Sequence, residues 1–312
     1  MPTIKLGNGV TARTFTPPPQ SFQPLKATRR DLLRYGFPPQ PKEPPLLRLW
    51  EVALSRPLEM IQPRFRTLVE VDYKLPKTST APAAPPHPPP MRSNVIGGAT
   101  VTAAAGQGTV RWVGGTWTIP NIYPHVGSEN GVGYPFLTEV FISGKASTSS
   151  LAVGWSGLVF YSGRSIQRRH GVWWRWAPGD FTGLSNFFVD PGDTLGCVIC
   201  LDLGSTVRAR LSFHNLTTSQ ATSFIVTAPS GTELTGDTAG WLIQNGVVDF
   251  HGPFIARFGE FYIDECNAGT TDSPAILHPA QAIYLIDFDT GEDVAYTNIL
   301  SDTLLQFRYV GA

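Results

Sequence analysis

Cysteine is scarce in this 312-residue chain, which contains only Cys197, Cys200 and Cys266. A small and odd number of cysteines is a poor framework for disulfide bonds and is more typical of a reducing compartment. Cys197 and Cys200 are three residues apart in a segment that resembles a β-strand, so their side chains should point to opposite faces. This spacing disfavours a redox or zinc motif and favours buried thiols.

An excess of either charge is also absent, because 24 basic residues balance 24 acidic ones. The balance gives no electrostatic reason to expect a nucleic acid or an anionic membrane as partner. No apolar run approaches the length of a membrane span. Residues 1–19 lack the basic start and apolar core of a secretory signal, so we expect a cytoplasmic protein. The six histidines show no metal-ligand spacing, and we expect neither a metal nor a cofactor.

Glycine and proline, in contrast, are abundant, with 31 and 28 residues, as is typical of a chain with many turns. From about Ser93 onward, short apolar segments alternate with turn residues at a spacing of roughly ten residues. The clearest strand-like segments are 109–118, 138–142, 157–161, 172–176, 196–201, 207–213, 223–227, 240–244, 255–263 and 281–288. The pattern predicts an all-β fold, an antiparallel two-sheet β-sandwich.

The first 92 residues have a different composition. We expect an N-terminal extension over residues 1–75, a proline-rich linker over 76–92, and the sandwich domain over 93–312. The proline run at 81–90 is compatible only with an extended linker or loop.

Two short helices are predicted within this partly helical extension. The first follows Thr28 as its N-cap and stops at Gly36. The second runs over 46–54, opened by Pro44 and ended by Pro57, with an apolar face. A short amphipathic helix cannot bury such a face alone, so the extension is expected to dock on the main domain or, as the alternative, on a partner.

Several strand motifs stand in the order and spacing of a known family. They are Thr116–Pro120, the tryptophan-rich Gly171–Pro178, Pro191–Asp193 and Ala239–Gln244. Together they resemble the core of the glutamic peptidases, or eqolisins, over roughly residues 93 to 290. The resemblance implies two long, curved sheets of concanavalin-like shape with a substrate cleft on the concave sheet.

The resemblance also implies that the catalytic positions have changed. The family's water-activating glutamate falls on Gln244, and its partner glutamine falls on Tyr161. An amide cannot exchange a proton as a carboxylate does, so the family's mechanism is not expected here. Tyr161 can still donate a hydrogen bond to an oxyanion. Arg175 stands where the family has glutamate, Glu139 where it has tryptophan, and Ser143 where it has aspartate.

A rewired site is therefore expected in the cleft. The expected catalytic residues are Glu139, Tyr161, Arg175 and Gln244, and the expected substrate-binding residues are Ser143, Trp173 and Trp241. A glutamate and an arginine placed in one apolar cavity are expected to pair. Taken singly, each residue has a plainer interpretation, as core packing, as a solvated sheet residue or as a charge that protects a sheet edge.

Three functions remain open. The first in rank is conversion of a small molecule, such as a cyclisation or cycloaddition in fungal specialised metabolism, because aromatic walls with Tyr, Gln and Arg donors can orient and polarise a carbonyl. The second is a non-catalytic, lectin-like sandwich that binds a sugar or another small ligand. The third is an acid endopeptidase that uses Glu139 as a relocated carboxylate. The oligomeric state stays open.

Overall fold

The computed structural model describes residues 3–40, 44–55, 58–67, 91–104, 108–144, 149–202, 204–244, 255–270, 276–287 and 290–311. The proline run at 81–90, predicted to be a linker, lies outside these ranges, as does almost all of 76–92.

Strands dominate the described part of the chain. The helices are α1 (Arg29–Tyr35) and α2 (Pro44–Ser55), with two 3-10 turns at Gly7–Gly9 and Pro24–Lys26. The strands are β1 (Thr3–Lys5), β2 (Thr11–Thr14), β3 (Glu59–Met60), β4 (Phe65–Thr67), β5 (Met91–Ser93), β6 (Ile96–Thr102), β7 (Val110–Thr118), β8 (Gly133–Ser143), β9 (Ser150–Ser162), β10 (Ser165–Trp176), β11 (Thr182–Leu184), β12 (Thr194–Leu201), β13 (Arg208–Asn215), β14 (Gln220–Thr227), β15 (Thr238–Gln244), β16 (Glu260–Thr270), β17 (Ile276–Leu277), β18 (Gln281–Ile286), β19 (Asp293–Ser301) and β20 (Leu304–Tyr309).

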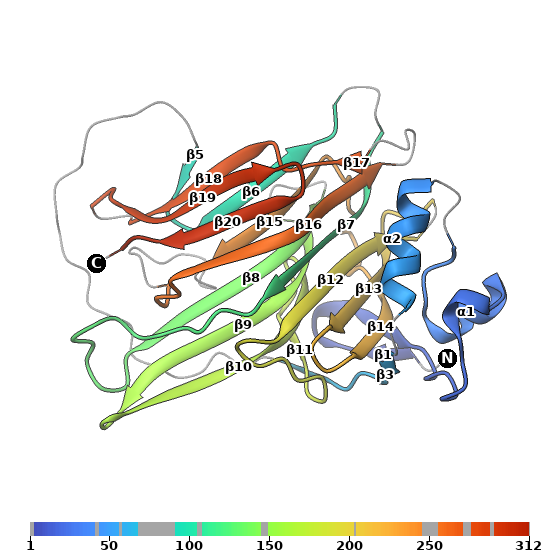
Figure 1. Ribbon diagram of the computed structural model, residues 1–312, viewed down its shortest axis with the longest axis horizontal. Helices are drawn as coiled ribbons and strands as arrows, with labels where there is room; N and C mark the ends of the chain where they lie inside the picture. The colour runs from blue at the N-terminus through green and yellow to red at the C-terminus, as the bar shows by residue number, and fades with distance from the viewer. Residues whose placement is uncertain are drawn as a thin grey trace.

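The strands form two layers that are hydrogen-bonded to each other along one edge (Figure 1). One layer has the order β4–β11–β10–β9–β8–β15–β6–β18. The other has the order β19–β20–β16–β7–β12–β13–β14–β2–β1, and β18 pairs with β19 to join them. Only the short strands β3 and β5 add in parallel among the described pairings. The predicted all-β, antiparallel sandwich is confirmed.

Buried tryptophans tie the two layers together. Trp241 of β15 is fully buried, and its Nε1 donates to the carbonyl oxygen of Gly114 on β7 at 2.7 Å. Trp155 of β9 is equally buried and donates to the carbonyl oxygen of Val189 at 3.0 Å. These hydrogen bonds satisfy two of the buried indole N–H groups, and the bond to Gly114 crosses from one layer to the other.

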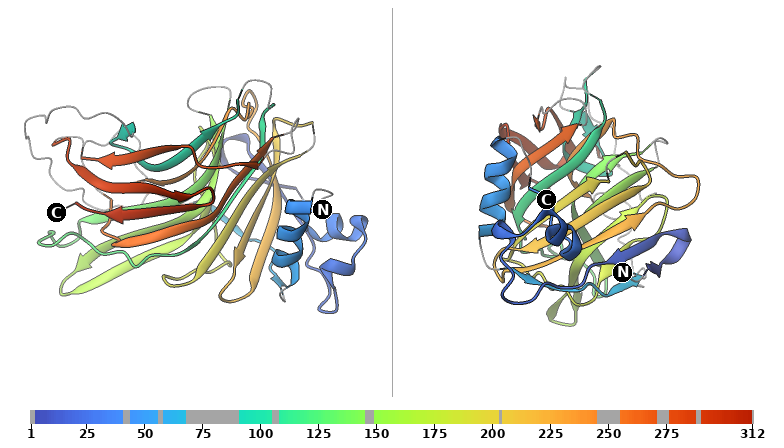
Figure 2. Two further views of the ribbon diagram at one scale, coloured as in Figure 1. Left: turned by 45° about the horizontal axis from the view of Figure 1, so that its top comes forward. Right: turned by 90° about the vertical axis from the view of Figure 1, so that its right-hand side faces the viewer.

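The N-terminal helices lie beside β13 and β14, at the end of the molecule away from the C-terminus (Figures 1 and 2). Helix α1 begins after Thr28, whose Oγ1 accepts a hydrogen bond from the Asp31 backbone N–H, and ends at Gly36 with φ of 85°. Leu32 of α1 and Trp50 of α2 share a buried apolar cluster. This cluster consists of extension residues, and the extension is attached to the sandwich by the pairing of β2 and β3 with β14 and by Arg210 of β13, whose Nη1 donates to the Phe37 carbonyl oxygen at 2.9 Å.

The segment 58–67 also closes the open side of the sandwich. Its β3 pairs with β14 in one layer and its β4 pairs with β11 in the other. Between the layers, the Phe65 ring contacts Trp174 and Phe224 with centroid distances of 6.4 and 4.9 Å. The extension is thus part of the same hydrophobic core as the strands that follow it.

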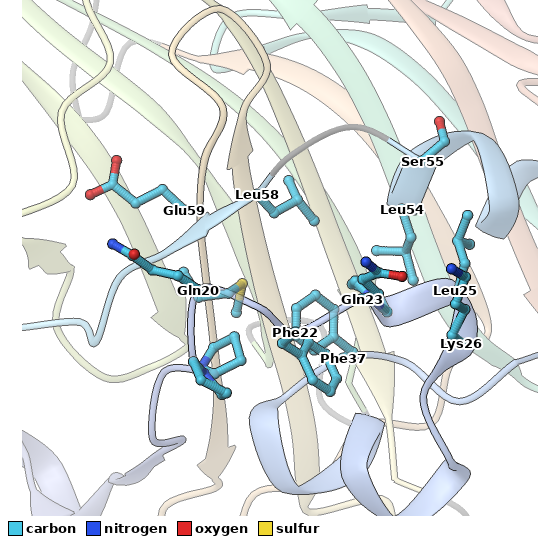
Figure 3. A pocket seen from close by; sticks show the side chains of 14 residues that line it. Gln20, Phe22, Gln23, Leu25, Lys26, Phe37, Leu54, Ser55, Leu58 and Glu59 are labelled. Carbon is cyan, nitrogen blue, oxygen red and sulfur yellow. The ribbon is translucent and has the colours of Figure 1, made fainter.

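A cavity of about 530 Å³ lies within the extension, walled by Phe22, Phe37, Leu54 and Leu58 (Figure 3). The polar side chains that line it are all exposed: Gln20, Gln23, Lys26, Ser55 and Glu59. Buried polar groups, which fix the orientation of a ligand, are therefore lacking among its described lining residues.

The longest described helix is α2, with 12 residues. Within the described ranges, no helix has the length and apolar character needed to cross a membrane.

Candidate functional site

The candidate site lies on the face of β15, β8, β9 and β10 that points away from the core, which we call the site face. In register across these strands stand Leu242, Glu139, Gly154 and Trp173. Directly paired residues of antiparallel strands project to the same side of a sheet. The alternate residues on the same strands, such as Trp241, Val140 and Trp155, belong to the main core.

Glu139 lies at the centre of the site face. Its side chain is buried, with 6% of the residue exposed, and its Oε2 accepts a hydrogen bond of 2.6 Å from Gln244 Nε2. Burial raises the pKa of the carboxyl from 4.5 to about 7, against the opposing effects of the Gln244 hydrogen bond and the Arg175 charge. Near neutral pH the carboxyl is therefore divided between its acid and ionised forms, as a general acid or base requires.

Arg175 does not form the predicted ion pair with Glu139. Its Nε donates to the carbonyl oxygen of Gly179 at 2.8 Å, and its guanidinium lies over the Phe181 ring at 4.8 Å from the centroid. In the sheet register Arg175 pairs with Ala152, which pairs in turn with Phe141, two residues from Glu139 along β8. The pairing expectation was wrong because a local carbonyl and a ring satisfy the guanidinium, while the Gln244 amide satisfies the carboxyl.

Trp173 supplies the aromatic wall of the site face. It is fully buried in a small cluster with Leu137 and Ala152, and it meets Phe181 edge-on at 4.8 Å between centroids. Its Nε1 has no hydrogen-bond partner among the described residues. The same holds for Trp117, Trp174 and Trp176 of the main core, so this feature alone does not mark a ligand site.

Gly154 separates Glu139 from Trp173. A Cβ at this position would lie 1.7 Å from the Thr138 carbonyl oxygen and 2.9 Å from the Glu139 Cα. Only glycine fits so close to the neighbouring backbone. The row consequently has no side chain between the carboxyl of Glu139 and the indole of Trp173.

Tyr161 is not brought to this site. It lies on β9 seven residues beyond Gly154, which corresponds to about 23 Å along a strand. Seven is an odd number of residues, and β9 pairs with β8 and β10 without a bulge. The Tyr161 side chain therefore lies on the face opposite the site face. The match of Tyr161 to the catalytic glutamine depended on the Ser162–Gly163 pair, and here Ser162 ends β9 while Gly163 and Arg164 form the turn to β10.

Two of the expected substrate-binding residues have structural roles instead. Trp241 belongs to the core between the layers, with its Nε1 bonded to Gly114, so it cannot contact a ligand on the site face. Ser143 is on the same face as Glu139 but four residues farther along β8, where its Oγ accepts a hydrogen bond from the Thr238 N–H at 2.9 Å. That bond fixes the start of β15.

Of the seven expected residues, the structure therefore groups Glu139, Gln244, Arg175 and Trp173. The expectation missed Phe181, which covers both Trp173 and Arg175. The turn residues Pro178 and Gly179 signal that the chain reverses there, but no pattern in the sequence indicates that the following ring folds back.

Comparison with known proteins identifies relatives of this architecture. The family model described as the Peptidase A4 family matches residues 94–309. A crystal structure of scytalido-glutamic peptidase with a peptide-based transition-state analogue is 19% identical, covering 70% of this chain and 98% of its own, with a TM-score of 0.54. SCP-B, a member of the eqolisin family of peptidases solved with the tripeptide Ala-Ile-His, has the same identity and coverage and a TM-score of 0.52. No curated protein matches the chain. At this identity the structural likeness shows the shared fold.

Proposed function

The chain belongs to the Peptidase A4 family. We propose that its site face binds a small molecule and converts it by a cyclisation or cycloaddition step, without proteolysis. The observation that carries the proposal is the buried Glu139 carboxyl, hydrogen-bonded to Gln244 and next to an aromatic wall. The proposed setting is specialised metabolism in a fungal cytoplasm.

Protonated Glu139 is the proposed donor in this reaction. With Oε2 bonded to Gln244, the proton is assigned to the other carboxyl oxygen, Oε1. It can present its proton to a carbonyl oxygen of a ligand that lies over Gly154. Hydrogen bonds aimed at a developing negative charge in a water-poor site are among the strongest catalytic effects.

A cycloaddition suits the residues of the site face. The reaction converts two π bonds into two σ bonds, and it needs no oxidant, no leaving group and no net transfer of a proton. What the protein must supply is the folded conformation of the substrate and polarisation of the acceptor carbonyl. Trp173 and Phe181 would orient the apolar part, while Glu139 would polarise the carbonyl.

An acid endopeptidase is the second candidate, and the Glu139–Gln244 pair favours it because glutamic peptidases also combine a glutamate with a glutamine. The pKa argues against it. A general base must be ionised at the working pH, and burial raises the pKa of Glu139 to about 7, so the carboxyl is protonated in acid.

The experiment compares metabolites of the source organism with and without the gene, by mass spectrometry with chiral separation. Without the gene we expect one product to disappear or to persist as mixed stereoisomers. Wild type and the control Tyr161→Phe should restore it, whereas Glu139→Gln should lower its rate of formation by about a hundredfold. Restored activity should fall as the pH rises through about 7, because deprotonation removes the donor.

Two results would overturn the proposal. An unchanged metabolite profile would leave a non-catalytic binding protein as the better interpretation. Cleavage of casein at acid pH by the wild type, lost in Glu139→Gln, would establish the endopeptidase instead.

A further inference from the structure

The N-terminal extension contributes a cation to the site face. Phe65 of β4 points into the core against Trp174, so its neighbour Arg66 points to the opposite side of the sheet. The Arg66 Nη2 lies 3.5 Å from the position that a Cβ of Gly171 would occupy. Gly171 pairs with Ser156, and the same row of paired residues continues to Gln244, whose side chain lies on the site face. The guanidinium of Arg66 therefore lies over the site face.

Arg66 completes a line of three guanidinium groups along β10. Arg169 and Arg175 project from β10 to the site face, two residues before and four residues after Gly171. Because Gly171 has no side chain, the guanidinium of Arg66 occupies the place that lies between those two arginines. Trp173 is the remaining member of this line.

Acidic partners for these arginines are lacking on the described part of the site face. None of Arg66, Arg169 and Arg175 forms an ion pair with a described residue. Glu139 is bonded to Gln244, and its raised pKa keeps it largely uncharged below neutral pH. The site face therefore has a positive charge in a protein whose formal net charge is zero.

We propose that the substrate carries a carboxylate, which Arg66 binds over Gly171 while the reacting part of the molecule lies between Trp173 and Glu139. The proposal rests on the proposed function and names its substrate class. Guanidinium and carboxylate form planar, two-point hydrogen bonds, and the neighbouring Ser156 hydroxyl already donates to the Gly171 carbonyl oxygen at 3.3 Å.

A phosphate fits this surface less well than a carboxylate. Phosphate sites in proteins use free backbone N–H groups, at a helix N-terminus or in a loop that cradles the anion. The backbone of β9 and β10 around Gly171 is paired in the sheet ladder and offers no such groups. The backbone that carries Arg66 is held in place, because β4 is bonded to β11 and anchored in the core by Phe65.

The test compares binding of 2-naphthoate with that of 2-naphthamide, its neutral isostere, by isothermal titration calorimetry near neutral pH. Wild type should bind the acid about tenfold more tightly than the amide. Arg66→Gln should abolish this preference, and Arg66→Lys should keep part of it. The control Arg30→Gln removes an equal charge from exposed α1 and should leave the preference unchanged.

Equal affinity for acid and amide in the wild type would overturn the proposal, as would a preference that survives in Arg66→Gln or a failure of both probes to bind. Inorganic phosphate that displaces 2-naphthoate more effectively than acetate does would reassign the site to phosphate. Thermal melting checks that Arg66→Gln is folded, and Arg66→Lys provides a second variant if it is not. Binding needs no turnover, so an unchanged metabolite profile beside an Arg66-dependent preference would reject only the catalytic proposal.

Discussion

The two faces of β10 carry adjacent tryptophans with different surroundings. Trp174 packs in the main core against Phe65 and Phe224, while Trp173 packs under Phe181 in the small cluster of the site face. Both are buried to 1% exposure or less. Burial alone therefore does not separate a core residue from a site residue on this sheet.

Charge does separate the two faces. Among the described Asp, Glu, His, Lys and Arg residues, only Glu139 is buried, and it lies on the site face. On the core face of the same layer, Thr138 donates to the Trp155 carbonyl and is buried without a charge. A buried carboxyl destabilises a fold unless it is bonded or neutral, so its presence on one face points to a use there.

The largest expected contrast between the faces is in stability. Trp241→Ala should lower the free energy of unfolding by about 3–5 kcal/mol, because it opens a cavity between the layers and leaves the Gly114 carbonyl without its donor. Trp173→Ala should cost less, since its cluster is small, but should abolish ligand binding. Urea denaturation measures both. A larger loss for Trp173→Ala would mean that the site face is also core.

An effect of intermediate size concerns pH. Because the pKa of Glu139 is raised in the folded state, its contribution to stability is complete below 4.5 and is lost as the pH rises through about 7. Relative to Glu139→Gln, the wild type should therefore lose about 3 kcal/mol of unfolding free energy between these pH values. Parallel pH profiles of the two proteins, measured by urea denaturation, would contradict the burial of an ionisable carboxyl.

The smallest expected effect is that of Tyr161→Phe. Its position near the β9–β10 turn, on the face opposite Glu139, predicts a change in unfolding free energy within about 0.5 kcal/mol and an unchanged affinity for ligand. Denaturation and calorimetry on this variant measure both quantities. A loss of ligand binding would place Tyr161 in the site and would reject the register-based assignment of the two faces.

Much of the β-domain was predictable because its strands carry their own signals. The predicted segments 196–201 and 240–244 lie within observed strands, and the predicted segments 109–118 and 207–213 begin one residue before β7 and β13. The segment 255–263 was only partly right, since β16 begins at Glu260. Ile255, Ala256 and Phe258 are buried in the core without forming a regular strand, so apolar composition alone could not give the boundary.

The candidate site was predictable where the spacing of residues along one strand decides which face each side chain occupies. Trp173 and Arg175 share a face because they are two residues apart, and the same holds for residues along β8. Tyr161 and Trp241 were misplaced for the same reason: a motif match ignores which face a side chain occupies. One residue of register moves a side chain from the ligand to the core.

The fold class, the family and the unusual set of polar residues on aromatic strands could all be recognised from the sequence. Alternation and turn residues are local properties, so they are readable without the fold. The tertiary structure alone decided that Gln244 bonds Glu139, that Phe181 folds over Trp173, and that Arg66 reaches the site from the extension. Each of these contacts depends on which strands become neighbours, and strand order is set by burial of the whole core rather than by any short segment.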